Sequence, residues 1–221
     1  MGIGKMDFLP LYVSLKLAVV TTVILMLLAA PVAYVLSYSN FRGKSLVEAF
    51  INLPMALPPT VLGFYLLLAL GSKGAVGRGW EMLTGNSLLF TFLGITIASI
   101  IYSIPIAVQP MKAAFQKIDT RLLESAYILG LSRSAAFIRV VIPNSISGAI
   151  AAAALVFLHS LGAFGVLLMV GGSIPGQTKV ASIAIYEAVE AMNYREAGLI
   201  ALCFIPISYV FLLLVNRLNK E

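Results

Sequence analysis

The sequence predicts an all-α membrane protein, in which a single transmembrane domain over residues 1–221 forms a helical bundle with five spans. Hydrophobic residues make up 60% of the chain and charged residues only 11%, too few to cover the surface of a soluble protein of this length. A bilayer core requires about 20 consecutive apolar residues for each helical span. Several segments of that length lack Asp, Glu, Lys and Arg, so lipid is the predicted main solvent.

Charge-free segments define the spans. The first contains only Lys16, near its start, where the side chain can extend to the interface. Its apolar run is far longer than that of a secretory signal peptide, so we expect it to stay uncleaved. The fourth charge-free stretch, 140–178, is too long for one span, and glycines and prolines interrupt its last third. The predicted spans are about 11–38, 48–71, 88–110, 144–170 and 196–216.

Lys and Arg residues orient the bundle, because cytoplasmic segments carry an excess of them. With the N-terminus outside and the C-terminus inside, nine lie on the inner side and five on the outer side. This predicts a multi-pass protein of the cytoplasmic membrane, and it makes the net charge of +6 a topology feature rather than a nucleic-acid-binding surface. The inner group is Arg42, Lys44, Lys112, Lys117, Arg121, Arg133, Arg139, Arg217 and Lys220, and the outer group is Lys5, Lys73, Arg78, Lys179 and Arg195.

The residue types within the spans exclude several function classes. No acidic or basic side chain lies in the middle of a predicted span, although ion-coupled pumps usually need one there, so the energy for transport is expected to come from elsewhere. The single cysteine, Cys203, forms no disulfide framework, and the sequence offers no metal-binding cluster. His159 and Ser160 are adjacent, point about 100° apart on a helix and lack a carboxylate in the same span, which argues against a hydrolase. No catalytic residue is predicted.

The second span contains prolines at 54, 58 and 59, each of which removes a backbone donor and clashes with the preceding turn. The helix is therefore expected to break at membrane depth, with Thr60 beside the break. Such a break is either a simple kink or part of a water-filled pathway.

Small and polar residues mark one face of the third span and one of the fourth. In the third span, Thr96, Ser99 and Ser103 recur at helical spacing, which indicates either a polar pathway or, slightly favoured, a helix–helix contact. In the fourth span, a stripe of small residues that includes Gly148 and Gly162 favours close helix packing.

The longest polar stretch, 112–143, is predicted to form two short helices on the cytoplasmic side. Asp119 can cap the first helix, Gly130 suits the left-handed conformation after its end, and Ser132 can cap the second. The apolar face of the first helix consists of Leu122, Ala126 and Leu129. This hairpin either lies on anionic lipid or docks a soluble partner. A further short helix is expected at the outer interface, over 180–192.

Within this hairpin, Glu124-Ser125-Ala126, Gly130 and Ile142-Pro143 resemble the EAA loop of the permeases of ATP-binding cassette (ABC) importers, with Ser125 in place of the usual Ala. In that family the loop's short helix docks into the ATPase subunit and transmits its closure. The segments LPPTVLGFYLL (57–67) and GGSIPGQTKVASIAIYEAV (171–189) are similar to the molybdate branch of these permeases. One departure is Gly162-Ala163-Phe164-Gly165, where that branch commonly has Gly-Glu-Phe-Gly near its outer gate.

The resemblance implies the type I ABC-importer permease architecture and a permease for molybdate, with tungstate or sulfate as the alternative within the class and a lone gradient-driven carrier or channel as the rival from another class. It also implies a homodimer, two ATPase subunits and an extracytoplasmic binding protein. The chain has no GxxxxGK[ST] loop, so ATP and Mg²⁺ would be bound by the ATPase, with no cofactor in this chain. The expected coupling residues are Leu122, Glu124, Ala126, Leu129, Gly130 and Pro143, and the pathway or gate candidates are Thr60, Ser99, Ser103, Gly162 and Phe164.

Overall fold

The computed structural model describes residues 7–218, and within that range every regular element is a helix, as predicted. Lys5 and Lys220, which were used to orient the bundle, lie outside the described residues. The helices are α1 (Leu9–Tyr38), α2 (Lys44–Ala56), α3 (Pro59–Leu70), α4 (Ala75–Thr84), α5 (Phe92–Gln116), α6 (Thr120–Ile128), α7 (Arg133–Ala136), α8 (Ile142–Asn144), α9 (Ile146–Gly162), α10 (Gly165–Gly171), α11 (Ala181–Glu190) and α12 (Tyr194–Leu218), with a π-helical turn, η1 (Phe137–Val141), between α7 and α8.

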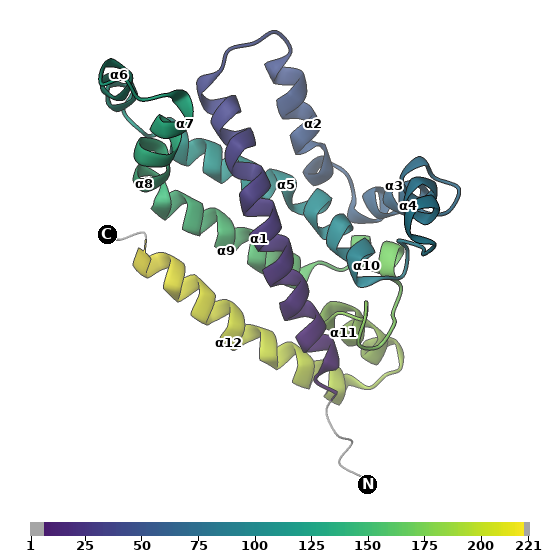
Figure 1. Ribbon diagram of the computed structural model, residues 1–221. Helices are drawn as coiled ribbons and strands as arrows, with labels where there is room; N and C mark the ends of the chain where they lie inside the picture. The colour runs from purple at the N-terminus through teal and green to yellow at the C-terminus, as the bar shows by residue number, and fades with distance from the viewer. Residues whose placement is uncertain (1–6, 219–221) are drawn as a thin grey trace.

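Helices α1, α5 and α9 pack against one another and form the centre of the bundle (Figure 1). Small residues permit this close approach: a Cβ placed on Gly148 of α9 would lie 2.3 Å from the Cβ of Ala114 on α5. The two largest clusters of buried apolar side chains lie toward opposite ends of the bundle. Their members include Leu17, Ile95 and Leu167 at one end and Leu36, Val108 and Val141 at the other.

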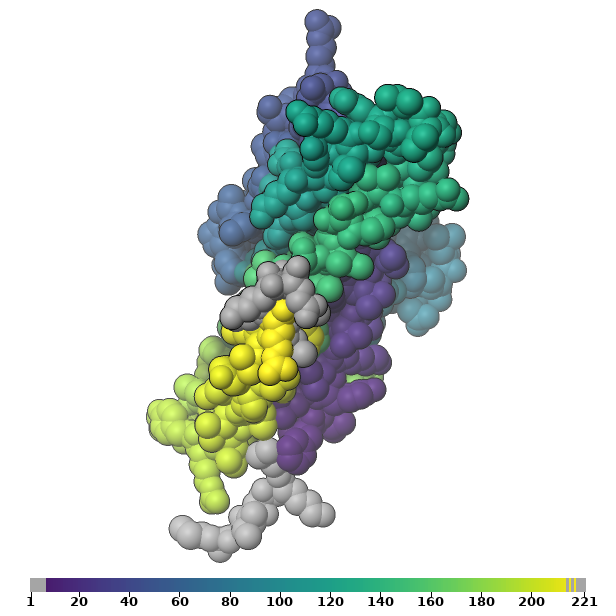
Figure 2. Space-filling view, turned by 90° about the vertical axis from the view of Figure 1, so that its left-hand side faces the viewer, coloured from purple at the N-terminus to yellow at the C-terminus, as the bar shows by residue number. Residues whose placement is uncertain are grey.

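The outer faces of the long helices are apolar and exposed. Helix α12 lies beside α1 (Figure 2) and also packs against α9. The ring of Phe211 stacks on that of Phe157 with centroids 4.1 Å apart. The other side of α12 exposes large apolar side chains such as Leu202 and Ile205. An apolar surface of this kind requires a lipid environment. Three helices are long and apolar enough to cross a membrane, and the number rises to five if each of two bent helix pairs is counted as one span.

The loops predicted to lie inside share one end of the bundle. The hairpin of α6–α8 packs against the end of α1, where the rings of Tyr34 and Phe137 have centroids 4.8 Å apart. The Tyr38 hydroxyl donates a hydrogen bond of 2.6 Å to the carbonyl of Phe115, close to the end of α5. The start of α1 and helix α11 lie at the opposite end (Figure 1). This arrangement agrees with the predicted sidedness of the loops.

The second span is broken at its prolines, as predicted. The chain bends by 108° between α2 and α3, and Pro59 is the first residue of α3. Pro54, in contrast, lies inside α2 and does not end it. The sequence predicted no element between 71 and 88, but α4 forms there and ends at Gly85, whose φ of +71° suits a residue without a side chain.

Two of the predicted spans differ from the helices of the structure. Helix α5 continues to Gln116, six residues beyond the expected end at 110, because the packing of its buried face against α1 and α9 persists past Pro110. The expected continuous span 144–170 is two helices, since α9 ends at Gly162 and α10 begins at Gly165. Ala163 and Phe164 between them have non-helical backbone angles.

The local predictions for the hairpin are confirmed. The Asp119 side chain accepts a hydrogen bond from the backbone N–H of Arg121 and caps α6, and the Ser132 side chain accepts one from that of Ala135 and caps α7. Gly130 has a φ of +83°, and the N–H of Leu131 donates to the carbonyl of Ala126, which closes the C-terminal turn. The second half of the hairpin, 133–144, meets α9 at a bend of 75°.

Candidate functional site

A hollow with a volume of about 550 Å³ lies where the start of α3, the middle of α5 and the junction of α9 with α10 meet; we call it the outer hollow. Three of the predicted pathway candidates, Thr60, Gly162 and Phe164, line it together. The proline break positions Thr60, and the break after α9 positions Phe164. The remaining lining residues are Pro59, Tyr102, Leu158, His159, Ala163 and Gly165. The polar groups of this lining are hydroxyls and one imidazole, with no charged side chain.

The other two pathway candidates, Ser99 and Ser103, do not line a hollow. Both side chains are fully buried within the chain. The Ser103 Oγ lies 3.5 Å from the Oγ of Ser160 on α9, at hydrogen-bond distance. The structure places both residues at a helix–helix contact, the alternative slightly favoured from the sequence, and at neither hollow. Small hydroxyl residues at such contacts let α5 approach α1 and α9 closely.

A second hollow of about 470 Å³, the inner hollow, lies between α5 and α9 near the hairpin end of the bundle. Its polar lining includes Lys117 at the end of α5 and Asn144 and Ser147 around the start of α9. On α9, residues 148, 151, 158 and 162 line the two hollows, and residues at these spacings share one helix face. On α5, residues 102, 110, 113 and 117 do the same. We call this shared side of the two helices the α5/α9 face.

The hairpin presents an apolar ridge away from the bundle. Leu129 is 79% exposed, Ile128 is 85% exposed and Leu122 is 47% exposed. Ala126, predicted on the same face, is instead buried together with Leu123 against the hairpin-end cluster. That part of the prediction was wrong because α7 and the π-helical turn η1 pack against one side of α6. The ridge is therefore formed by Leu122, Ile128 and Leu129, and the contribution of Ile128 was missed.

The remaining predicted coupling residues lie on the surface of the hairpin. Glu124 is exposed and lines a pocket of about 450 Å³ between α6, the start of α7 and the end of α1, together with Tyr127 and Arg133. Pro143 is exposed in α8, and Gly130 closes the turn between the two halves. These residues share one hairpin, but they do not converge on a single pocket.

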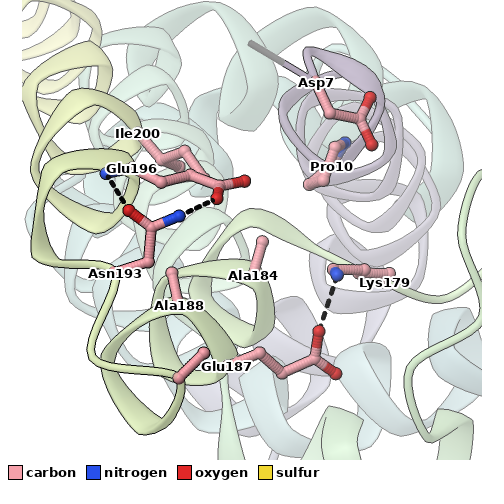
Figure 3. A pocket seen from close by; sticks show the side chains of 10 residues that line it. Asp7, Pro10, Lys179, Ala184, Glu187, Ala188, Asn193, Glu196 and Ile200 are labelled. Atoms are coloured by element: carbon pink, nitrogen blue, oxygen red, sulfur yellow. Dashed lines mark hydrogen bonds and ion pairs between the residues drawn. The ribbon is translucent and has the colours of Figure 1, made fainter. Parts of the chain in front are cut away.

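Helix α11 confirms the expected short helix at the outer end, and a pocket of about 200 Å³ separates it from the starts of α1 and α12 (Figure 3). Here the ammonium of Lys179 lies 2.6 Å from the carboxylate of Glu187, and Asn193 donates a hydrogen bond to Glu196 (Figure 3). Burial raises the pKa of the Glu187 carboxyl, but the Lys179 ammonium together with the nearby Ser173 hydroxyl more than offsets this and holds the pKa below its usual value. The ion pair fixes α11 to the segment that precedes it.

The family model described as "Binding-protein-dependent transport system inner membrane component" matches residues 16–221. The chain belongs to this family. It is therefore a multi-pass protein of the cytoplasmic membrane and the permease component of a transport system that also has a binding protein. This agrees with the resemblance carried by the EAA-like hairpin.

Known relatives cover almost the whole chain. The molybdenum transport system permease protein ModB of Azotobacter vinelandii is 40% identical over 96% of this chain and 94% of its own length. The corresponding protein of Haemophilus influenzae is 32% identical over 98% of this chain and 95% of its own. The probable sulfate transport system permease protein cysT of Prototheca wickerhamii is 29% identical over 92% of this chain and 79% of its own.

Solved structures share the fold at low sequence identity. A bacterial ABC transporter involved in the import of the acidic polysaccharide alginate superposes with a TM-score of 0.79 and 16% identity, over 98% of this chain and 80% of its own. The MetNI methionine ABC transporter superposes with a TM-score of 0.76 and 16% identity, over 100% of this chain and 98% of its own. The predicted architecture of a type I ABC-importer permease is confirmed.

Tyr102 and His159 were not predicted to line a pathway. They belong to the faces of α5 and α9 that carry both hollows, yet the sequence indicated only a packing stripe on α9. Their rings lie together, with centroids 4.5 Å apart, although 57 residues separate them along the chain. The signal that could have found His159 is the helical period of three and four residues that links it and Gly162 to Gly148.

Proposed function

We propose that this chain is the permease subunit of an ABC importer for molybdate, driven by ATP hydrolysis on a separate ATPase subunit. The main support for molybdate as the substrate is the 40% identity, over 96% of the chain, with a permease named for molybdenum transport. The outer hollow supports it, because its lining offers hydroxyl and imidazole groups and no charged side chain. A site built from fixed positive charges would hold a dianion tightly and release it slowly.

The proposed mechanism joins the hairpin to the hollows. Closure of two ATPase subunits, which bind ATP and Mg²⁺, moves the hairpins of two permease copies together. The bundles then rock, and the pathway opens toward the outside. Molybdate leaves an extracytoplasmic binding protein, which docks near α11, and passes along the α5/α9 face. This chain holds no cofactor and performs no hydrolysis in this scheme.

Uptake of labelled molybdate tests the proposed substrate. Cells that contain the chain and its ATPase are expected to accumulate molybdate from nanomolar concentrations, and cells without the chain are not. Excess unlabelled tungstate should compete, while equimolar sulfate should not. Uptake abolished by equimolar sulfate would instead favour the sulfate importer suggested by the similarity to cysT. Molybdate uptake that persists when the ATPase is absent would favour a carrier that works alone.

We further propose that a second copy of the chain covers the α5/α9 face. Both hollows are open along this face, and one chain alone cannot enclose a pathway there. Leu155 lies on α9 between the two hollows and is 47% exposed, so its side chain is accessible on the same helix face. A twofold axis along this face would close both hollows at once.

Cross-linking between two copies tests this dimer. In a chain with Cys203→Ser, we expect Leu155→Cys to give a covalent dimer with a bifunctional maleimide, because the two introduced thiols would face each other across the axis. Leu202→Cys is the matched control, since this leucine is exposed on α12 on another side of the bundle. A dimer yield from Leu155→Cys no higher than that from Leu202→Cys would contradict the proposed interface.

A further inference from the structure

The imidazole of His159 has an unusual environment in the outer hollow. Its Nε2 atom is buried and has no hydrogen-bond partner within the described chain. The ring of Tyr102 packs against it at an angle of 43°, which restricts its orientation. Leaving a buried polar nitrogen unpaired is unfavourable, so such a group in a native structure requires an explanation.

Three other buried side-chain atoms of the described chain are also unpaired, and their surroundings differ. They are the hydroxyl oxygens of Thr21, Ser99 and Ser173. None of these residues lines the outer or the inner hollow, whereas His159 lines the outer hollow. The hydroxyls of Thr21 and Ser99, which lie within helices, can also rotate toward the carbonyl of the preceding turn, and the rigid imidazole has no such local acceptor. Only at His159, among these four atoms, is an unpaired group combined with space for a ligand.

The lining of the outer hollow indicates what that ligand is. A neutral imidazole with its proton on Nε2 is a hydrogen-bond donor, as are the hydroxyls of Thr60 and Tyr102. Glycine, alanine, proline, leucine and phenylalanine supply the rest of the wall, with no carboxylate to repel an anion. Ala163, one helical turn after His159 in sequence, offers only a methyl group, so it cannot pair with the ring. Uncharged donors in an apolar hollow suit an oxyanion that must bind briefly and leave.

We propose that His159 donates a hydrogen bond from Nε2 to a tetrahedral oxyanion as it crosses the outer hollow, and that Tyr102 positions the ring for this contact. The inference rests on the proposed importer function and adds a pathway residue to it. The bond forms only while the anion passes, so His159 lowers the barrier to translocation. Loading of the binding protein and ATP hydrolysis do not depend on it.

The test uses the complete transporter in proteoliposomes, with its ATPase and its loaded binding protein, and molybdate as the probe. His159→Leu should lower molybdate uptake per ATP hydrolysed about tenfold, since a hydrogen bond to a charged group is lost. His159→Gln retains an N–H donor and should recover most of the uptake. Tyr102→Phe keeps the ring that packs on the imidazole and should retain more transport than Tyr102→Ala, which should resemble His159→Leu.

Two outcomes would overturn this inference. If His159→Leu took up as much molybdate per ATP hydrolysed as the native transporter, His159 would have no role in translocation. Equal loss in His159→Leu and His159→Gln, with both proteins assembled normally, would assign the residue to packing rather than hydrogen bonding. Failure of the proposed substrate is distinguishable, because the unmodified transporter would then not take up molybdate. The same variants would in that case be measured with sulfate, and a loss by His159→Leu that His159→Gln restores would still support the oxyanion contact.

Discussion

Replacing Leu129 with Asp is expected to abolish transport while leaving the protein folded in the membrane. Leu129 is 79% exposed and follows the last turn of α6, so a carboxylate there meets solvent and disturbs no buried contact. A docking surface depends on a few apolar anchors that are fully desolvated when the partner binds. Burying a carboxylate at such an anchor without a partner costs several kcal/mol, which corresponds to a loss of affinity of roughly a hundredfold or more.

The matched control is Thr120→Asp, which adds the same charge at the opposite end of α6. Thr120 is the first residue of α6, where a negative charge is favourable, and it lies outside the ridge. Co-purification of the ATPase, molybdate uptake and the amount of permease in the membrane are the three measurements. Leu129→Asp should lose the ATPase and the uptake but not the permease, and Thr120→Asp should keep all three. If Leu129→Asp retained the ATPase and transported normally, the ridge would not be the docking surface.

Interactions within a few residues were predictable from the sequence. Asp119, Ser132 and Gly130 were assigned correctly because each capping bond joins groups no more than five residues apart, and the residue types that suit these positions are few. The break before Pro59 followed from the missing backbone donors for the same reason. The presence of apolar spans followed from composition alone.

Tertiary contacts decided what the sequence could not. Ser99 and Ser103 have the spacing of a polar pathway, yet their burial depends on which side of α5 meets α1 and α9. Ala126 is on the edge of the apolar face of α6, and the packing of α7 and η1 against this helix determines that it is covered. The pairing of Tyr102 with His159 depends on two helices distant in sequence. A periodic sequence pattern identifies one face of a helix, but it does not show which other helix packs against that face.

Gly148→Ala is expected to destabilise the bundle, although alanine is ordinarily the better helix former. The new Cβ would lie 2.3 Å from the Cβ of Ala114, and because that atom is fixed to the backbone of α5, the helices must separate. Forcing such an overlap costs about 1–3 kcal/mol, more than the about 1 kcal/mol that alanine gains over glycine in a helix. The separation would also widen the inner hollow, which Gly148 lines.

Gly162→Ala is the matched control on the same helix. A Cβ at Gly162 meets nothing within 4 Å and points into open space, so this variant should equal or exceed the native protein in stability. Thermal unfolding of the detergent-solubilised permease, followed by size-exclusion chromatography, compares the two substitutions directly. A lower unfolding temperature for Gly148→Ala alone would confirm that the contact between α5 and α9 limits stability. Equal unfolding temperatures for the two variants would mean that α5 and α9 move apart without a loss of stability. Because both glycines lie on the α5/α9 face, the comparison separates a residue that holds the helices together from one that leaves room beside them.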